Sequence, residues 1–132
     1  MTSVLLRHAW AGDRDDWDGD DRLRPLDERG RKQAQELVGL LAPLGVARVV
    51  SSPYVRCVET VEPLAAALGV EVGRDDRLAE GAGDAALGLL AGDGVVACTH
   101  GDVVEDVLGY GLKKGAAAVF EDGRAVRTIP AP

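Results

Sequence analysis

LLRHAWAG, residues 5–12, is an apolar run that ends abruptly in Arg7 and His8 and then passes into a loop of small residues. Short, continuous apolar runs are typical of parallel strands that are covered on both faces of a sheet. Further runs of this kind follow along the chain at residues 47–50, 70–72 and 95–99. Together with residues 3–6 they predict four buried strands, the first of which carries His8 at its tip.

Helical patterns alternate with these strands, at residues 27–41, 53–68, 85–90 and 103–108. The first of them places Leu37, Leu40 and Leu41 at helical spacing. Pro63 predicts a kink or a restart in the second, because proline lacks the amide hydrogen that a helix interior uses.

The tail of the chain, residues 116–120 and 125–129, reads as two strands joined by EDGR, whose Asp-Gly pair is a strong hairpin signal. The whole pattern predicts one α/β domain over residues 1–132. Its expected architecture is a mainly parallel sheet with helices on both faces and a C-terminal β-hairpin. Aromatic residues make up only 4% of the chain, and Trp10 and Trp17 either line the mouth of a site or cover the core, the second being the more common role in so aromatic-poor a chain.

The bulk composition limits the classes of function. A length of 132 residues with 46% hydrophobic and 28% charged residues fits one globular domain. The net charge of −7 argues against general nucleic-acid binding and against an anionic membrane surface, since neither polyanion would be attracted. No signal peptide or membrane-spanning run is recognisable, and Cys57 and Cys98 lack the spacing of a disulfide framework or zinc site. We therefore expect a cytoplasmic protein with two reduced thiols.

Polar side chains follow the predicted strands at the points where those strands end. In chain order they are Arg7 and His8, Ser52 and Arg56, Glu80 after a loop, and His100. Each of them alone has an ordinary structural explanation, such as a hydrogen-bonded histidine or a solvated arginine. Ligands bind beyond the carboxyl ends of parallel strands, so the convergence of two histidines, two arginines and a glutamate indicates a functional site.

The start of the second helix supports a phosphate ligand. Ser52 is a natural N-cap for a helix whose first residue is Pro53. Side chains on a helix lean toward its N-terminus, so Arg56 reaches back over amide groups that attract anions. An arginine above a helix N-terminus is suited to a phosphate group.

Five motifs carry a resemblance to a known family: LLRHAWAG, RPLDERGRKQA, SSPYVRCVET, RLAEG and CTHGD. In this order, from Val4 to about Asp106, they resemble the histidine phosphatase superfamily, which is also called phosphoglycerate-mutase-like. The short chain resembles its small SixA-like branch of phosphohistidine phosphatases. The chain is also similar to phosphatase domains attached to some Nudix hydrolases. It contains no Nudix segment, so a Nudix partner would be a separate protein.

The resemblance implies a role for each site residue. His8 is the nucleophile that forms a phosphohistidine, and it must be neutral, with a backbone carbonyl holding its other ring N–H. Arg7, Arg56 and His100 surround the phosphoryl group and neutralise its charge, and Ser52 is a further candidate phosphate ligand. The family uses no metal and no cofactor.

Two acidic residues compete for the role of proton donor. Glu80 occupies the place where many family members keep a catalytic glutamate, and we assign the role to it. Asp102, two residues after His100, is the alternative acid.

The function expected from this resemblance is metal-independent hydrolysis of a phosphomonoester or phosphoramidate, with a phosphohistidine protein as one possible substrate and a phosphorylated small molecule as the other. Two alternatives are a phosphoglycerate-mutase-like phosphotransferase and a non-catalytic phosphate-binding regulatory module. A mutase usually has longer insertions that enclose its substrate, and binding alone does not require a nucleophile at His8.

The acidic loop Asp13–Asp21 resembles a calcium loop only in part. Asp16, Asp18 and Asp20 alternate as calcium ligands do, but the sixth and twelfth positions of that pattern are aspartates where glycine and glutamate belong. Arginines lie among these carboxylates, so we predict a loop held by salt bridges and no metal site.

Overall fold

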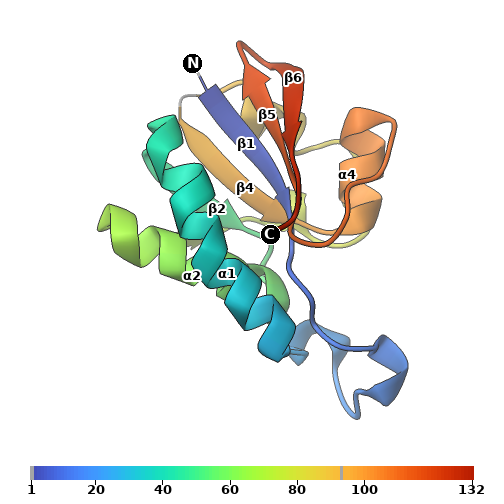
Figure 1. Ribbon diagram of the computed structural model, residues 1–132. Helices are drawn as coiled ribbons and strands as arrows, with labels where there is room; N and C mark the ends of the chain where they lie inside the picture. Colours follow the sequence, from blue (N-terminus) through green and yellow to red (C-terminus); the bar gives the residue numbers. More distant parts are fainter. Residues whose placement is uncertain (1, 93) are drawn as a thin grey trace.

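The computed structural model describes residues 2–92 and 94–132, which form a six-stranded sheet with helices on both faces (Figure 1). In chain order the strands are β1 Thr2–Arg7, β2 Arg48–Ser51, β3 Val72–Arg74, β4 Val95–Thr99, β5 Ala117–Glu121 and β6 Arg124–Ile129. Their order across the sheet is β3-β2-β4-β1-β5-β6. The pairs among β3, β2, β4 and β1 are parallel, whereas β5 is antiparallel to both β1 and β6. The predicted α/β architecture is confirmed.

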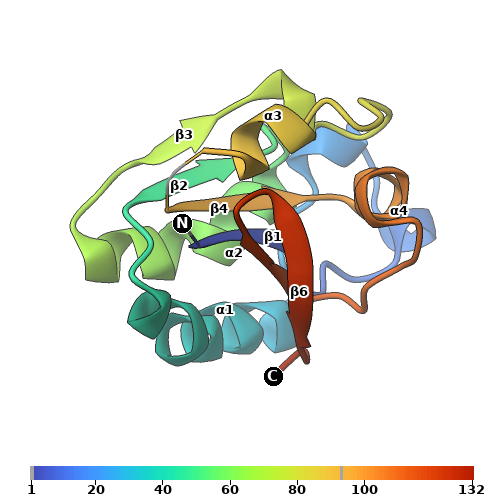
Figure 2. The same cartoon turned by 90° about the horizontal axis from the view of Figure 1, so that it is seen from above.

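Two helices cover each face of the sheet. The helices are α1 Glu28–Leu41, α2 Val55–Leu68, α3 Leu87–Leu90 and α4 Gly101–Leu108, with short 3-10 helices η1 Arg14–Asp16, η2 Asp21–Leu23, η3 Ala42–Leu44 and η4 Asp76–Leu78. Figure 2 shows α1 and α2 on one side of the sheet and α3 on the other, the side on which α4 also packs. In the part of the chain that the structure describes, no helix has the length and apolar character needed to cross a bilayer.

The alternation of side chains along β1 builds two separate core layers. Successive residues of a strand point to opposite faces of the sheet. Val4 and Leu6 therefore pack with Leu37 of α1, whereas Leu5 packs with Val103 of α4 on the opposite face. All the core residues of β1 are fully buried, so the strand that leads to His8 is fixed from both sides.

Two details of the second helix differ from the prediction. Helix α2 begins at Val55 rather than at Pro53, and it continues through Pro63 without a break. An interior proline removes one helical hydrogen bond and costs roughly 3 kcal/mol. Val61 and Leu64, on either side of Pro63, are buried in the core against the sheet, and this packing holds the helix together across the proline.

The third strand begins two residues later than predicted. The Val70 amide donates to Ala65 O at 3.0 Å, so Val70 completes the end of α2 instead of joining the sheet. The predicted helix at residues 85–90 is shorter in the structure, and the one predicted at residues 103–108 begins earlier, at Gly101.

The C-terminal hairpin is confirmed. Asp122 and Gly123 connect β5 to β6, and both have positive φ angles, 50° and 79°. Two-residue turns with positive φ at both positions match the twist of the flanking strands and favour Asp-Gly. The turn chemistry in the sequence therefore accounts for this edge of the sheet.

Candidate active site

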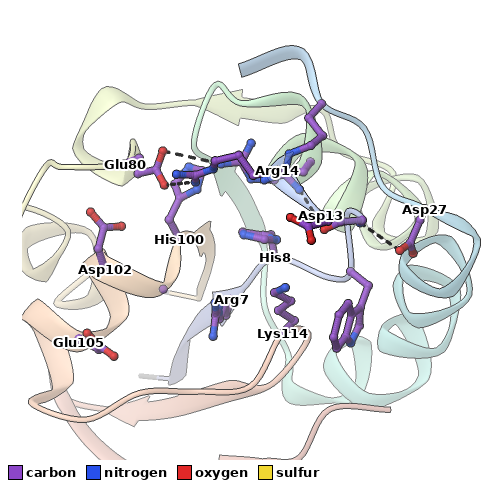
Figure 3. A pocket seen from close by; sticks show the side chains of 15 residues that line it. Arg7, His8, Asp13, Arg14, Asp27, Glu80, His100, Asp102, Glu105 and Lys114 are labelled. Atoms are coloured by element: carbon purple, nitrogen blue, oxygen red, sulfur yellow. Dashed lines mark hydrogen bonds and ion pairs between the residues drawn. The ribbon is translucent and has the colours of Figure 1, made fainter. Parts of the chain in front are cut away.

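The register between β1 and β4 brings the two histidines together. Arg7 of β1 pairs with Thr99 of the parallel strand β4. His8 and His100 are the next residues along each strand, so they leave the sheet at the same edge. Their ring centroids lie 5.6 Å apart with an interplanar angle of 66°. The predicted meeting of both histidines at one sheet edge is confirmed, and both line a single cleft (Figure 3).

His8 is held as a neutral imidazole with one nitrogen available. Its Nδ1 lies 2.8 Å from Ala9 O, and because a carbonyl only accepts, Nδ1 is the protonated nitrogen and Nε2 carries the lone pair. The side chain is nearly buried, with 6% exposed. Burial lowers the pKa of His8 to about 3, and the nearby His100, Arg56 and Arg7 act in the same direction against the hydrogen bond to Ala9. This is the tautomer expected from the sequence.

His100 is oriented by Ser52, whose hydroxyl Oγ lies 2.8 Å from His100 Nε2. The same hydroxyl accepts the Tyr54 amide hydrogen at 3.2 Å, so its own hydrogen is free to be donated to Nε2. In that arrangement the proton of a neutral His100 is on Nδ1. The Cys57 thiol, free and buried as expected, lies 3.5 Å from the same Nε2.

Ser52 does not have the place predicted for it. It is not the N-cap of α2, whose N-cap position is Tyr54 without a side-chain hydrogen bond. It is fully buried and is not among the residues that line the cleft. Because Pro53 and Tyr54 precede the helix as an irregular segment, the serine hydroxyl turns toward His100. Its contacts are those of a positioning residue that acts through His100.

Three buried side-chain nitrogens lack a hydrogen-bond partner among the described residues: Arg7 Nε, Arg56 Nε and His100 Nδ1. All three side chains line the cleft that also contains His8. Leaving a buried donor unsatisfied costs about 1–3 kcal/mol, so such groups in native proteins generally have a partner. The cleft that these side chains share with His8 is therefore suited to a ligand that carries several acceptor oxygens.

The Arg7 guanidinium is fixed from the opposite side by the segment that follows α4. Its Nη1 donates to Leu112 O at 2.7 Å. An ideal Cβ at Gly101 would lie 2.9 Å from Arg7 Cζ, so the absence of a side chain there lets the guanidinium lie against the start of α4. Burial lowers the pKa of Arg7, and Glu105 partly opposes this effect. The arginine remains a cation at neutral pH.

Arg56 is nearly fully buried, and its guanidinium donates hydrogen bonds to the acidic loop. Its Nη1 donates to Asp21 O at 2.8 Å, and its Nη2 lies 3.1 Å from Asp21 Oδ2. Asp21 also pairs with Arg24 at 2.9 Å and with Arg14 at 3.5 Å. Burial alone would raise the pKa of Asp21, but the three arginines together hold it below its usual value. The acidic loop thus holds Arg56 through Asp21, a contact that the sequence did not predict.

A further salt bridge of the kind predicted for the acidic loop is made by Asp20. Asp20 pairs with Arg22 at 2.8 Å, and its side chain also accepts the Arg22 amide hydrogen. Within residues 2–92 and 94–132, no group of three or more histidine, cysteine, aspartate or glutamate side chains is placed to hold a metal ion.

Glu80 and Asp102 both line the cleft but have different partners. Glu80 Oε1 accepts from Arg14 Nη2 at 2.7 Å, and Oε2 lies 3.8 Å from Arg56 Nη2 (Figure 3). Asp102 Oδ2 accepts the Gly81 amide hydrogen at 2.7 Å. Asp102 therefore secures the backbone next to Glu80, while Glu80 itself faces the arginines of the site.

The cleft as a whole has a volume of about 760 Å³ and contains cationic donors around the neutral His8. Comparison with known protein families gives a match over residues 4–90 to the model described as the histidine phosphatase superfamily, branch 1. This range includes His8, Arg56 and Glu80. The chain belongs to the histidine phosphatase superfamily.

A curated relative of this histidine phosphatase domain comes from Mycolicibacterium smegmatis and is called 8-oxo-(d)GTP phosphatase. It is 43% identical over 79 residues, which is 60% of this chain and 24% of the relative. The chain thus spans about a quarter of the length of the curated relative that it matches.

Solved structures of other histidine phosphatases share the fold. SixA from Agrobacterium tumefaciens has a TM-score of 0.76 and 24% identity, covering 99% of this chain and 97% of that one. A protein histidine phosphatase SixA complexed with tungstate has a TM-score of 0.75 and 20% identity, covering 98% and 97% of the two chains. At these identities the likeness establishes the fold.

Several residues of this histidine phosphatase cleft were not predicted from the sequence: Trp10, Arg14, Arg24 and Lys114. Of the two roles considered for the tryptophans, Trp10 has the site-lining one, whereas Trp17 is 38% exposed and does not belong to the core. The signal for Arg14 and Arg24 was the mixture of arginine and aspartate after the first strand. Lys114 lies in a loop far along the chain, and no local pattern marks it.

The lowered pKa of His8 predicts a pH dependence of stability. As the pH falls below 6.5, the unfolded chain takes up a proton on His8 that the folded protein does not bind until the pH approaches 3. Between pH 7 and pH 5, this histidine alone should reduce the free energy of unfolding by about 2 kcal/mol. Chemical denaturation of the wild type and of His8→Gln at both pH values measures the difference.

His8→Gln should lose less stability than the wild type on acidification, because glutamine does not titrate. Carboxylates affect both proteins equally, so the comparison isolates the imidazole. Equal losses of stability in the two proteins would contradict a neutral, buried His8.

Proposed function

We propose that this histidine phosphatase domain hydrolyses phosphomonoesters or phosphoramidates through a phosphohistidine intermediate on His8. The observation that carries the proposal is that Arg7, Arg56 and His100, which line the cleft together with His8, each have a buried side-chain nitrogen without a hydrogen-bond partner among the described residues. A phosphoryl group in this position accepts hydrogen bonds from all three. The neutral Nε2 of His8 then faces the phosphorus atom.

In the first step, the lone pair of His8 Nε2 forms a bond to phosphorus while the bond from phosphorus to the leaving group breaks. The equatorial oxygens gain charge, and Arg7, Arg56 and His100 stabilise it. Phosphoryl transfer depends mostly on positioning and electrostatics, which fixed cationic donors supply. We assign to Glu80 the transfer of a proton to the leaving group.

In the second step, water attacks the phosphorus atom of the phosphohistidine, and the bond from phosphorus to His8 Nε2 breaks. Glu80, now ionised, accepts a proton from that water, and inorganic phosphate leaves. The side chains of Arg14 and Glu80 at the rim are 58% and 32% exposed, so water reaches this side of the cleft. This supports hydrolysis rather than the mutase alternative, which depends on keeping water out.

The substrate class follows the shape and polarity of the site. An open cleft lined by charged side chains accommodates a phosphohistidine on a protein surface or a phosphorylated small molecule. The SixA structures point to the first class and the mycobacterial relative, named for a nucleotide, to the second. A separate Nudix protein as a partner stays a prediction from the sequence resemblance.

Turnover of p-nitrophenyl phosphate in the presence of EDTA tests the proposal. We expect full activity after chelation, because Arg7, Arg56 and His100 provide the charge neutralisation that a cation would otherwise supply. Release of inorganic phosphate, measured with and without an alcohol acceptor, separates hydrolysis from transfer.

Three results would count against the proposal. Absence of turnover would support the non-catalytic binding module. Transfer to the acceptor in place of phosphate release would support the mutase alternative. Loss of activity in EDTA, restored by calcium or magnesium, would return the Asp13–Asp21 loop to consideration as a metal site.

A further inference from the structure

A second pocket of about 540 Å³ adjoins the cleft. Its lining combines four cationic side chains with an indole, an amide and the C-terminal tail: Arg7, Arg29, Lys113, Lys114, Trp10, Gln33 and residues 131–132. No acidic side chain is among these lining residues. In a chain whose net charge is −7, such a pocket is a local concentration of positive charge.

Three of the four cations in this pocket have no ion-pair partner in the part of the chain that the structure describes. Among the described residues, no carboxylate lies within 4.0 Å of Arg29, Lys113 or Lys114, although other arginines of the chain have such partners. Burial lowers the pKa of Lys114, as do the neighbouring Arg7 and Arg24, while Asp13 and Asp27 act against this at longer range. Cations that repel one another and are partly withdrawn from water stabilise a bound anion.

The pocket wall is held in place by hydrogen bonds. Gln33, 3% exposed, accepts the Trp10 amide hydrogen at 3.1 Å and donates to Lys114 O at 3.2 Å. The Arg29 guanidinium and the Lys114 ammonium each lie 4.2 Å from the centre of the Trp10 ring. Cation–π contacts of this kind restrict where a cation can lie. The positive charges are therefore positioned before any ligand arrives.

The second pocket and the cleft are continuous, because Arg7, Trp10 and Lys114 line both. A molecule whose phosphoryl group lies at His8 can extend past Lys114 into the second pocket. We propose that this pocket is a subsite for a second phosphate group of the substrate, so that the preferred substrates are bisphosphorylated small molecules. This inference rests on the proposed function, since it assigns a substrate class to the same site.

The test compares α,ω-alkanediol bisphosphates of different lengths with the alkyl monophosphates of matching length. For at least one length, we expect kcat/KM to be about tenfold or more higher for the bisphosphate, the scale of one charge-assisted hydrogen bond. Lys114→Gln should lower the ratio of kcat/KM for the bisphosphate to kcat/KM for the monophosphate by about the same factor. The double variant Arg29→Gln with Lys113→Gln should lower this ratio by about as much. Equal kcat/KM values at every length, or an unchanged ratio in both variants, would overturn the subsite.

Arg48→Gln is the matched control. Arg48 is an exposed arginine at the start of β2, whereas the cleft lies beyond the other ends of the parallel strands. Arg48→Gln changes the net charge by the same amount as Lys114→Gln. Because Arg48 lies far from the cleft, kcat/KM should stay unchanged for both the bisphosphate and the monophosphate. If Arg48→Gln lowered the ratio as much as Lys114→Gln, the preference would come from net charge and the subsite would be wrong.

Failure of the proposed function has a different signature. If neither the bisphosphates nor the monophosphates are hydrolysed, the phosphatase proposal fails. The subsite is then tested by titration calorimetry, in which a bisphosphate should bind about tenfold more tightly than its monophosphate and lose this advantage in Lys114→Gln. Equal affinities in that experiment would overturn the subsite as well.

Discussion

Replacing His8 with alanine should abolish turnover, with a fall in kcat of roughly 10⁵-fold or more, because the variant lacks the group that forms the covalent intermediate. In the wild type, a brief reaction with a labelled substrate should trap a phosphoenzyme. The label should be lost in acid and retained in base, as expected of a phosphoramidate. The alanine variant should acquire no label.

His100→Ala is the matched control for that experiment, because it removes the other histidine of the site and leaves the nucleophile. It should form the labelled phosphoenzyme slowly, since one donor to the phosphoryl oxygens is missing. Normal turnover in His8→Ala, or labelling that does not depend on His8, would end the covalent mechanism.

Glu80→Gln should slow hydrolysis of alkyl or sugar phosphates by roughly 10²–10⁴-fold, the usual contribution of a general acid. The effect should depend on the leaving group. An alkoxide leaves poorly without a proton, whereas p-nitrophenolate leaves readily alone, so turnover of p-nitrophenyl phosphate should change much less. Measurement of kcat for both substrate types gives the comparison.

Asp102→Asn provides the counterpart. Its side-chain oxygen can still accept the Gly81 amide hydrogen, so the backbone beside Glu80 keeps its support. We expect no dependence on the leaving group in this variant. The reverse pattern would identify Asp102 as the acid. Absence of any dependence in both variants would mean that the enzyme has no dedicated acid, which would favour phosphohistidine-like substrates.

The sequence predicts the sheet and the centre of the site well because both depend on local patterns. Val95–Thr99 is a strand in the structure with the boundaries expected from its apolar run, and all of it is buried. His8 and His100 each follow such a run directly. Because β1 and β4 are neighbouring parallel strands, the two histidines leave the sheet at the same edge.

The remainder of the site depends on contacts between segments distant in sequence. Asp21 contacts Arg56, and Lys114 lies over the Trp10 ring. Asp21 and Lys114 belong to segments without a periodic sequence pattern, so neither contact can be predicted from the sequence. The restart expected at Pro63 does not occur, and the burial of the residues around this proline is likewise a tertiary effect. Ser52 is a further example. The local motif predicted an N-cap, whereas its contact with His100 depends on a segment far away in the sequence.

The central place of β1 has a consequence for how the chain is synthesised. Leu5 pairs with Ala97 on one side and with Ala118 on the other, so the first strand made must wait for the last third of the chain before either neighbour exists. Closing such long loops is slow compared with forming local helices. While residues 95–121 have not yet been made, the apolar strand β1 has neither of its neighbours and remains exposed, so a chaperone can bind residues 2–7 during that interval.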